Sequence, residues 1–170
     1  SDGNAVAVWT QESTTLAQKL DPDGLPLWGG GVTLSSAGVG LSASDLRASD
    51  AGHVIVSMVA SAGGPSPRHL WAQKLDSATG ASLWAAGHVK VFDEASGSLQ
   101  FGNFPDFVVD GAGGAVFSWY TSSTSLQVRD QRVVSAGTEV FAHNGVEVST
   151  NASQLRVSPS ASYLAGSQEI

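Results

Sequence analysis

The strongest constraint on this chain is an internal repeat with a period of about 55 residues. The string Ala-Gln-Lys-Leu-Asp occurs at residues 17–21 and again at 72–76, and in both places a turn and the dipeptide Leu-Trp follow. A weaker third copy has Gln131 and, after its turn, Phe141 in place of the tryptophan. Two identical pentapeptides with the same continuation at nearly the same spacing are very unlikely to arise by chance. The chain is therefore predicted to consist of copies of one unit.

Two further elements recur with the same period. The first is an apolar segment that follows a glycine, at residues 3–9, 52–58, 113–119 and, more weakly, 162–167. The second precedes the first, at residues 46–49, 107–109 and 155–158. These segments are short, rich in β-branched and aromatic residues, and bounded by Gly, Asp, Ser or Pro, which is typical of β-strands. No segment shows the apolar period of an amphipathic helix.

Four antiparallel strands in every 50 to 60 residues are the pattern of β-propeller blades. One such sheet cannot bury both of its faces, so neighbouring sheets must cover them. The predicted fold is all-β, with about three blades in an incomplete ring. Residues 1–44 form a first blade that begins at its second strand, residues 45–104 and 105–153 form two more, and residues 154–170 begin a further blade. An open β-sandwich or a β-solenoid is the alternative.

Three blades are too few to close a propeller, which needs four or more. The chain is therefore expected to be part of a longer protein or to complete a ring with other copies or segments. It begins Ser1-Asp2-Gly3-Asn4, without a methionine or signal peptide, which favours a piece of a longer protein.

Composition excludes several classes of partner and site. Of the 170 residues, 42% are apolar, which is enough for a core, and 14% are charged, with a net charge of −7. The negative charge argues against nucleic acid and against an anionic membrane surface. The absence of cysteine excludes disulfides and thiolate zinc sites. No apolar run reaches the roughly 20 residues that span a bilayer, so membrane insertion is not expected.

The sequence nominates no catalytic residue, no metal site and no cofactor. Residues 21–24, Asp-Pro-Asp-Gly, resemble the start of a calcium loop, but a hairpin turn explains them because the later ligands are missing. No Gly-x-Ser-x-Gly nucleophile motif is present. The histidines are scattered without metal-binding spacing: His53, His69, His88 and His143.

The repeated polar and aromatic residues are expected to have structural roles. We expect Gln18, Gln73 and Gln131 to bond to backbone within or between blades, because a buried amide needs partners. The alternative is a ring of amides that faces a ligand channel. Trp28 and Trp84 recur at the same site, which predicts packing between blades.

Other aromatic residues are the candidates for ligand binding. Rings exposed on a surface can stack against sugars, and the alternative for each is a place in the core. The candidates are Trp9, Trp71, Trp119 and Tyr120. Residues 93–105 form an insertion that carries two phenylalanines and is expected either to form a binding rim or to cap a blade edge.

The repeat pattern resembles that of a known group of proteins. The strings Ala-Gln-Lys-Leu-Asp, Leu-Trp and Gly-Gly-Ala-Val-x-x-Trp are similar to propeller-type repeats of large secreted or surface proteins of bacteria. They are also superficially similar to the blades of quinoprotein (PQQ-like) dehydrogenases, but neither the cofactor-binding residues nor the vicinal cysteines of those enzymes are present. The resemblance implies a bacterial protein that is secreted or displayed on the cell surface.

The expected function is that of a non-catalytic binding or scaffolding segment of a secreted or cell-surface propeller protein. The alternatives are a carbohydrate-binding, lectin-like propeller, a structural subunit of an extracellular assembly, and an enzyme with its site in the propeller channel. The expected partners are the protein segments or copies that complete the ring and, for the lectin alternative, a glycan.

Overall fold

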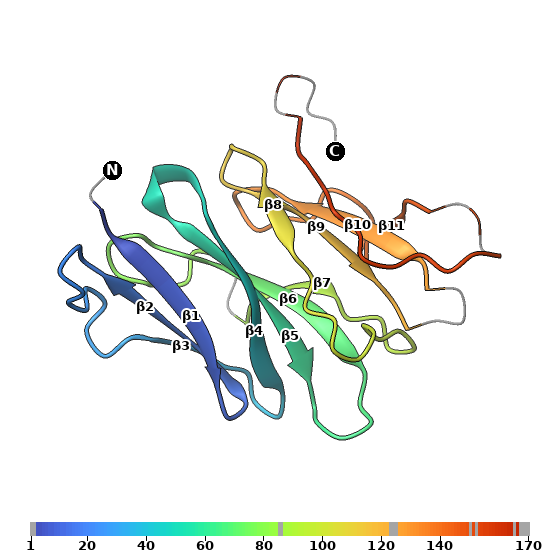
Figure 1. Ribbon diagram of the computed structural model, residues 1–170, viewed down its shortest axis with the longest axis horizontal. Coiled ribbons are helices and arrows are strands. Elements are labelled where there is room, and N and C mark those ends of the chain that lie inside the picture. Colours follow the sequence, from blue (N-terminus) through green and yellow to red (C-terminus); the bar gives the residue numbers. More distant parts are fainter. Residues whose placement is uncertain are drawn as a thin grey trace.

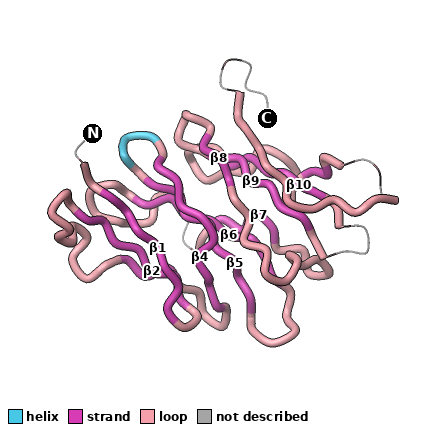
Figure 2. The backbone as a smooth tube through the Cα atoms, viewed as in Figure 1, coloured by secondary structure: helices cyan, strands magenta, loops and turns pink. Residues whose placement is uncertain are grey.

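The chain is built almost entirely from β-strands and loops (Figures 1 and 2). The computed structural model describes residues 3–84, 87–122, 126–149, 151, 153–164 and 166. Within these ranges the one helical element is a short 3₁₀ turn, Asp50–Gly52. The predicted all-β class is therefore confirmed. A search of the described residues finds no helix that is long and apolar enough to cross a membrane.

The described strands form three antiparallel sheets in which strands that are consecutive in the chain lie side by side. The first sheet contains β1 (Ala5–Gln11), β2 (Thr14–Leu20) and β3 (Val32–Leu34). The second contains β4 (Gly40–Ala48), β5 (Val54–Ser61), β6 (Arg68–Leu75) and β7 (Val89–Phe92). The third contains β8 (Phe107–Val109), β9 (Ala115–Tyr120), β10 (Val128–Val133) and β11 (Val146–Glu147).

The repeated sequence elements occupy equivalent positions in the three sheets. The segments that follow a glycine form β1, β5 and β9, and the glutamine-bearing segments form β2, β6 and β10. Each repeated glutamine pairs across the sheet with the equivalent residue of the preceding strand: Ala7 with Gln18, Val56 with Gln73, and Phe117 with Gln131. The sequence repeat is thus also a repeat of strand register.

The middle sheet is buried on both faces because it lies between the other two (Figure 1). Along β5, Val54, Val56 and Met58 belong to the hydrophobic cluster shared with the first sheet. The alternate residues Ile55 and Val59 belong to the cluster shared with the third sheet. This two-sided burial explains why β5 has a continuous apolar sequence, where a strand with one wet face would alternate.

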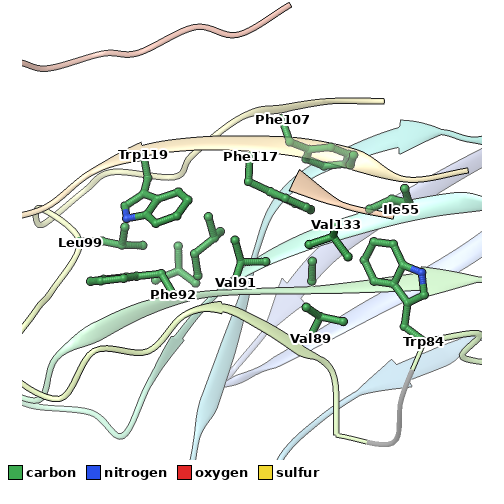
Figure 3. Close-up of a cluster of buried hydrophobic side chains, with 14 residues drawn as sticks. Ile55, Trp84, Val89, Val91, Phe92, Leu99, Phe107, Phe117, Trp119 and Val133 are labelled. Atoms are coloured by element: carbon green, nitrogen blue, oxygen red, sulfur yellow. The ribbon is translucent and has the colours of Figure 1, made fainter. Parts of the chain in front are cut away.

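Aromatic rings fill the core between the second and third sheets (Figure 3). The ring centroids of Phe92 and Trp119 are 5.6 Å apart, and those of Phe107 and Phe117 are 5.0 Å apart. Each pair falls in the range at which aromatic contacts add to the free energy gained by burial. The Phe92–Trp119 contact joins β7 of the second sheet to β9 of the third, and the Phe107–Phe117 pair joins neighbouring strands within the third sheet.

The weakest sequence copies do not form regular strands. Residues 155–158, which were expected to form a strand, lie in irregular structure beside the third sheet. Of the expected strand 162–167, Leu164 takes part in an isolated bridge, and residues 165 and 167 lie outside the described ranges. A strand needs a neighbour along its edge, and residues 155–158 have no neighbouring strand in the described chain.

The first strand of the second sheet begins earlier than the unit boundary that was predicted at residue 45, since β4 begins at Gly40.

Replacing Phe117 with alanine tests the core between the second and third sheets. Phe117 is fully buried, so Phe117→Ala should lower the free energy of unfolding by about 3–5 kcal/mol. Urea denaturation measures the change. Phe101 is 85% exposed, so the matched change Phe101→Ala should cost less than about 1 kcal/mol. Equal losses at the two positions would contradict this assignment of the core.

Candidate functional site

The three repeated glutamines organise the loops that leave their strands. The Gln73 Oε1 atom accepts hydrogen bonds from the backbone N–H groups of Lys74 at 2.9 Å and of Trp84 at 3.0 Å. Equivalent pairs of bonds run from Lys19 and Trp28 to Gln18, and from Arg132 and Phe141 to Gln131. One side-chain oxygen therefore holds the aromatic residue of each loop at a fixed place relative to its strand.

The amide nitrogens of the glutamines are also directed into these loops. Gln18 donates to the carbonyl of Gly29 at 3.1 Å, and Gln131 donates to the carbonyl of Ala142 at 3.0 Å. Backbone bonding by the glutamines, the expected role, is therefore confirmed. Because their hydrogen-bonding groups are used by their own loops, the structure does not favour a ring of amides facing a ligand.

The two repeated tryptophans join neighbouring sheets through the same hydrogen bond. The Trp28 indole N–H of the first sheet donates to the Ser77 carbonyl in the turn after β6, at 3.3 Å. The Trp84 indole of the second sheet donates to the Ser135 carbonyl in the turn after β10, at 3.0 Å. The predicted packing of these tryptophans between neighbouring sheets is confirmed.

Each of these two tryptophans also lies against a glycine in a turn of the following sheet. A Cβ atom on Gly80 would lie 2.9 Å from the Trp28 ring, and one on Gly137 would lie 2.9 Å from the Trp84 ring. Gly24 has the equivalent place in the turn of the first sheet, and all three glycines have positive φ. A Cβ on Gly24 would meet no other part of the described chain within 4 Å. The first sheet thus presents a glycine turn that no tryptophan contacts.

Repeated cations reinforce the contacts between sheets. Lys19 Nζ donates to the Ser77 carbonyl at 3.0 Å, and Lys74 Nζ donates to the Gly113 carbonyl at 2.9 Å. Lys74 also forms an ion pair with Asp50, and the hydrogen bond from this lysine holds the pKa of the Asp50 carboxyl below its ordinary value. Each lysine therefore links its own sheet to the next one along the chain.

Among the strands that the structure describes, none lies over one face of the first sheet. In the second and third sheets, the equivalent face packs against the preceding sheet. Ala7 is exposed, whereas its counterparts Val56 and Phe117 are fully buried. Trp9 is 42% exposed, whereas its counterpart Trp119 is fully buried. We call this surface the outer face; it consists of Ala5, Ala7, Trp9, Leu16, Gln18 and Leu20.

The structure does not bring the four aromatic ligand-binding candidates together. Trp71 lies in the core between the first two sheets and Trp119 in the core between the last two. Tyr120 is half-buried at the end of β9. Trp9 alone of the four is exposed, on the outer face. Ligand binding at these residues stays a prediction, and Trp9 has the most accessible ring.

A polar groove between the first two sheets is lined by Phe101, from the insertion at residues 93–105, and by Arg68, Ser13 and Ser61, for which the sequence predicted no role. Phe101 is exposed at its edge, and the Arg68 guanidinium lies 4.6 Å from the centroid of the Phe101 ring. Hydroxyls of Ser13 and Ser61 line the same groove. No carboxylate of the described residues forms an ion pair with Arg68. Only the exposure of Phe101 was open to prediction, from its place in an insertion.

A histidine between two carboxylates joins the second and third sheets. The His143 imidazole contacts Asp93 through Nε2 at 2.7 Å and Glu139 through Nδ1 at 2.9 Å. Partial burial opposes the charged imidazole, but the hydrogen bonds and charges of the two carboxylates outweigh it, so the pKa of His143 is raised. Both ring nitrogens are used, and the described residues contain no cluster that could hold a metal ion. The protonated imidazole thus forms ion pairs with Asp93, in the loop after β7, and with Glu139, in the loop after β10. We call these three residues the His143 clamp.

Removing a buried glutamine tests the organisation of the loops. Gln73→Ala leaves two buried backbone N–H groups without their acceptor, so the free energy of unfolding should fall by about 1–3 kcal/mol. Gln18 makes the same bonds but is half-exposed, so water can replace its side chain and Gln18→Ala should cost less. Chemical denaturation measures both changes. A larger loss at Gln18 would overturn this account.

The His143 clamp predicts a pH-dependent part of the stability. A raised pKa in the folded state means that the contribution is fully present below the unfolded pKa of 6.5 and is lost as the pH rises through the folded value. Between about pH 6 and about pH 9, the wild type should lose more unfolding free energy than His143→Gln. Urea denaturation across this pH range measures the difference. Parallel curves for the two proteins would rule the clamp out.

Comparison with known proteins adds no family assignment: no family model, curated protein or solved structure matches the chain.

Proposed function

We propose that this chain is a non-catalytic scaffolding module made of propeller-type blades, which binds a further sheet of the same kind through its outer face. One observation carries the proposal. The same sheet-to-sheet contact occurs twice within the chain, with Trp28 on Gly80 and Trp84 on Gly137. The first sheet presents the receiving half of a third such contact, the turn at Gly24, with no tryptophan on it.

The propeller interpretation is supported by the way in which the sheets are built and stacked. Each is a meander of short antiparallel strands, and the sheets follow one another in chain order with their faces packed together (Figure 1). Blades of a propeller are covered in this way by their neighbours on both sides. A closed ring would give the first and third sheets the second neighbour that the middle sheet already has.

The outer face has the chemistry of an interface with another sheet. It carries alanine, leucine and tryptophan side chains around Gln18, whose amide is bonded to its own loop, and the nearby loop adds the exposed residues Leu25 and Leu27. Burying apolar surface of this kind contributes about 25 cal/mol per Å² to an association, before the entropic cost of bringing two bodies together is subtracted. Contiguous exposed apolar surface usually marks a contact with another molecule or segment.

The proposed place of action is the surface or the exterior of a bacterial cell. The support for this is the resemblance of the repeats to those of large exported bacterial proteins, together with the low charged content of 14%. A glycan that stacks on Trp9 would use the outer face and would therefore compete with a further sheet for the same surface.

A tandem duplication of the chain tests the proposed function. If sheets continue across the junction, amide hydrogens of β1 and β2 in the second copy should exchange more slowly than in the single chain. Ala7→Arg in that copy places a charge at the centre of the outer face and should restore fast exchange. Ala95→Arg changes an exposed loop residue in the same way and should have no effect. Unchanged exchange in the tandem protein would refute the proposal.

A further inference from the structure

The first sheet has a free edge along β1. In the second sheet, β4 pairs with β5, and in the third sheet, β8 pairs with β9. Within the described residues, β1 pairs with β2 on one side and with no strand on the other. A seven-residue edge of this kind presents unpaired backbone N–H and C=O groups, which can pair with a strand from another chain.

We propose that residues 154–158 of one copy of the chain pair with β1 of a second copy and form the fourth strand of its first sheet. This inference rests on the proposed function, since it names the partner of the first sheet and the segment that docks. Residues 155–158 read Leu-Arg-Val-Ser, and residues 46–49, at the end of β4, read Leu-Arg-Ala-Ser. The segment therefore shares three of four residues with the end of β4, and the first sheet has no counterpart of β4 among the described strands.

The other two sheets fix the register of this pairing. In the second sheet, Leu46 pairs with Val56 and Ala48 pairs with Val54. In the third sheet, the equivalent residues make the equivalent pairs: Phe107 with Phe117, and Val109 with Ala115. The two sheets therefore share one register. If the first sheet follows the same register, Leu155 lies opposite Ala7, the equivalent of Val56 and Phe117, and Val157 lies opposite Ala5. In this register the two apolar side chains lie over the outer face.

The segment is available in the present structure. Leu155 is 63% exposed and Val157 is 54% exposed, although both are apolar. The backbone N–H of Arg156 donates to the Leu126 carbonyl beside the third sheet, at 3.0 Å. Strand β1 lies at the opposite end of the long axis of the molecule (Figure 1). Two sheets thus separate the segment from β1 of its own chain, whereas a second copy can approach it freely.

The pairing would also bring a partner sheet to the outer face. Glu147 ends β11, and Leu155 follows eight residues later. Eight residues span at most about 29 Å, and packed sheets lie about 10 Å apart. The third sheet of the second copy can therefore lie on the outer face while its residues 154–158 pair with β1. Phe141 of that sheet holds the place that Trp28 and Trp84 have in the contacts within one chain.

Engineered cysteines test the inference cleanly because the chain has none of its own. The single variants Ala7→Cys and Leu155→Cys are mixed in equal amounts and oxidised. Directly opposed residues have Cα atoms about 4.5–5.5 Å apart, which a disulfide can bridge. A disulfide-linked pair of one chain of each kind should be the main product on a non-reducing gel. A second mixture, Ala5→Cys with Val157→Cys, should give the same result.

The control mixture combines Leu155→Cys with Ala95→Cys, which is exposed and lies outside both the outer face and the register. It should give only the background of random collisions. Equal yields in the control, or no linked pair in either mixture, would overturn the inference. A disulfide within one chain of the double variant Ala7→Cys/Leu155→Cys would also overturn it. It is possible to distinguish this failure from failure of the proposed function. If no linked pair forms but the amide hydrogens of β1 in the second copy of the tandem protein still exchange slowly, the scaffolding function stands. Only the pairing of β1 with residues 154–158 of a second chain is then refuted.

Discussion

The structure depends on one hydrogen-bonding arrangement that is used three times. In each sheet a glutamine side-chain oxygen accepts two backbone N–H groups, one next to it and one ten or eleven residues later. The second bond fixes the start of the loop that carries Trp28, Trp84 or Phe141. In the first two sheets this loop places an indole against a glycine turn of the next sheet. A local bond within one sheet thereby determines where the next sheet can lie.

The stacking itself follows from the burial requirement of a sheet with two apolar faces. Strand β5 is apolar at nearly every position, and the middle sheet meets this requirement with a neighbour on each side. The first sheet also has apolar residues on its outer face, but no sheet of the described part of the chain lies beside them. The difference between buried Val56 and exposed Ala7 is a difference of position in the stack, since the two residues are equivalent in the repeat. The proposed association would give the outer face the environment that its counterparts already have.

Much of the fold could be predicted from the sequence, because the repeat revealed which segments are equivalent and the strand signals showed what they form. The role of the glutamines was also predictable, since a buried amide needs partners. The exposure of single aromatic residues was not: Trp9 and Trp119 share one place in the repeat, and only the order of the sheets decides which is buried. The strand expected at 155–158 failed for a similar reason, because a strand also needs an edge to pair with. The clamp at His143 joins residues 50 positions apart in the chain, and no local pattern indicates it.

The contact between tryptophan and glycine has a consequence for how such a chain can change its length. The second sheet carries both halves of this contact: Trp84 docks on the third sheet, and the turn at Gly80 receives Trp28 of the first sheet. If every unit of a longer array were built in this way, all of its junctions would be equivalent. Gain or loss of a whole unit by duplication or deletion of its coding segment would therefore leave every remaining junction intact. Stability in such an array is the sum of terms within units and terms between neighbours, and the terminal units have fewer of the latter. Unfolding should accordingly start from the ends, and a longer array should hold its inner units more firmly.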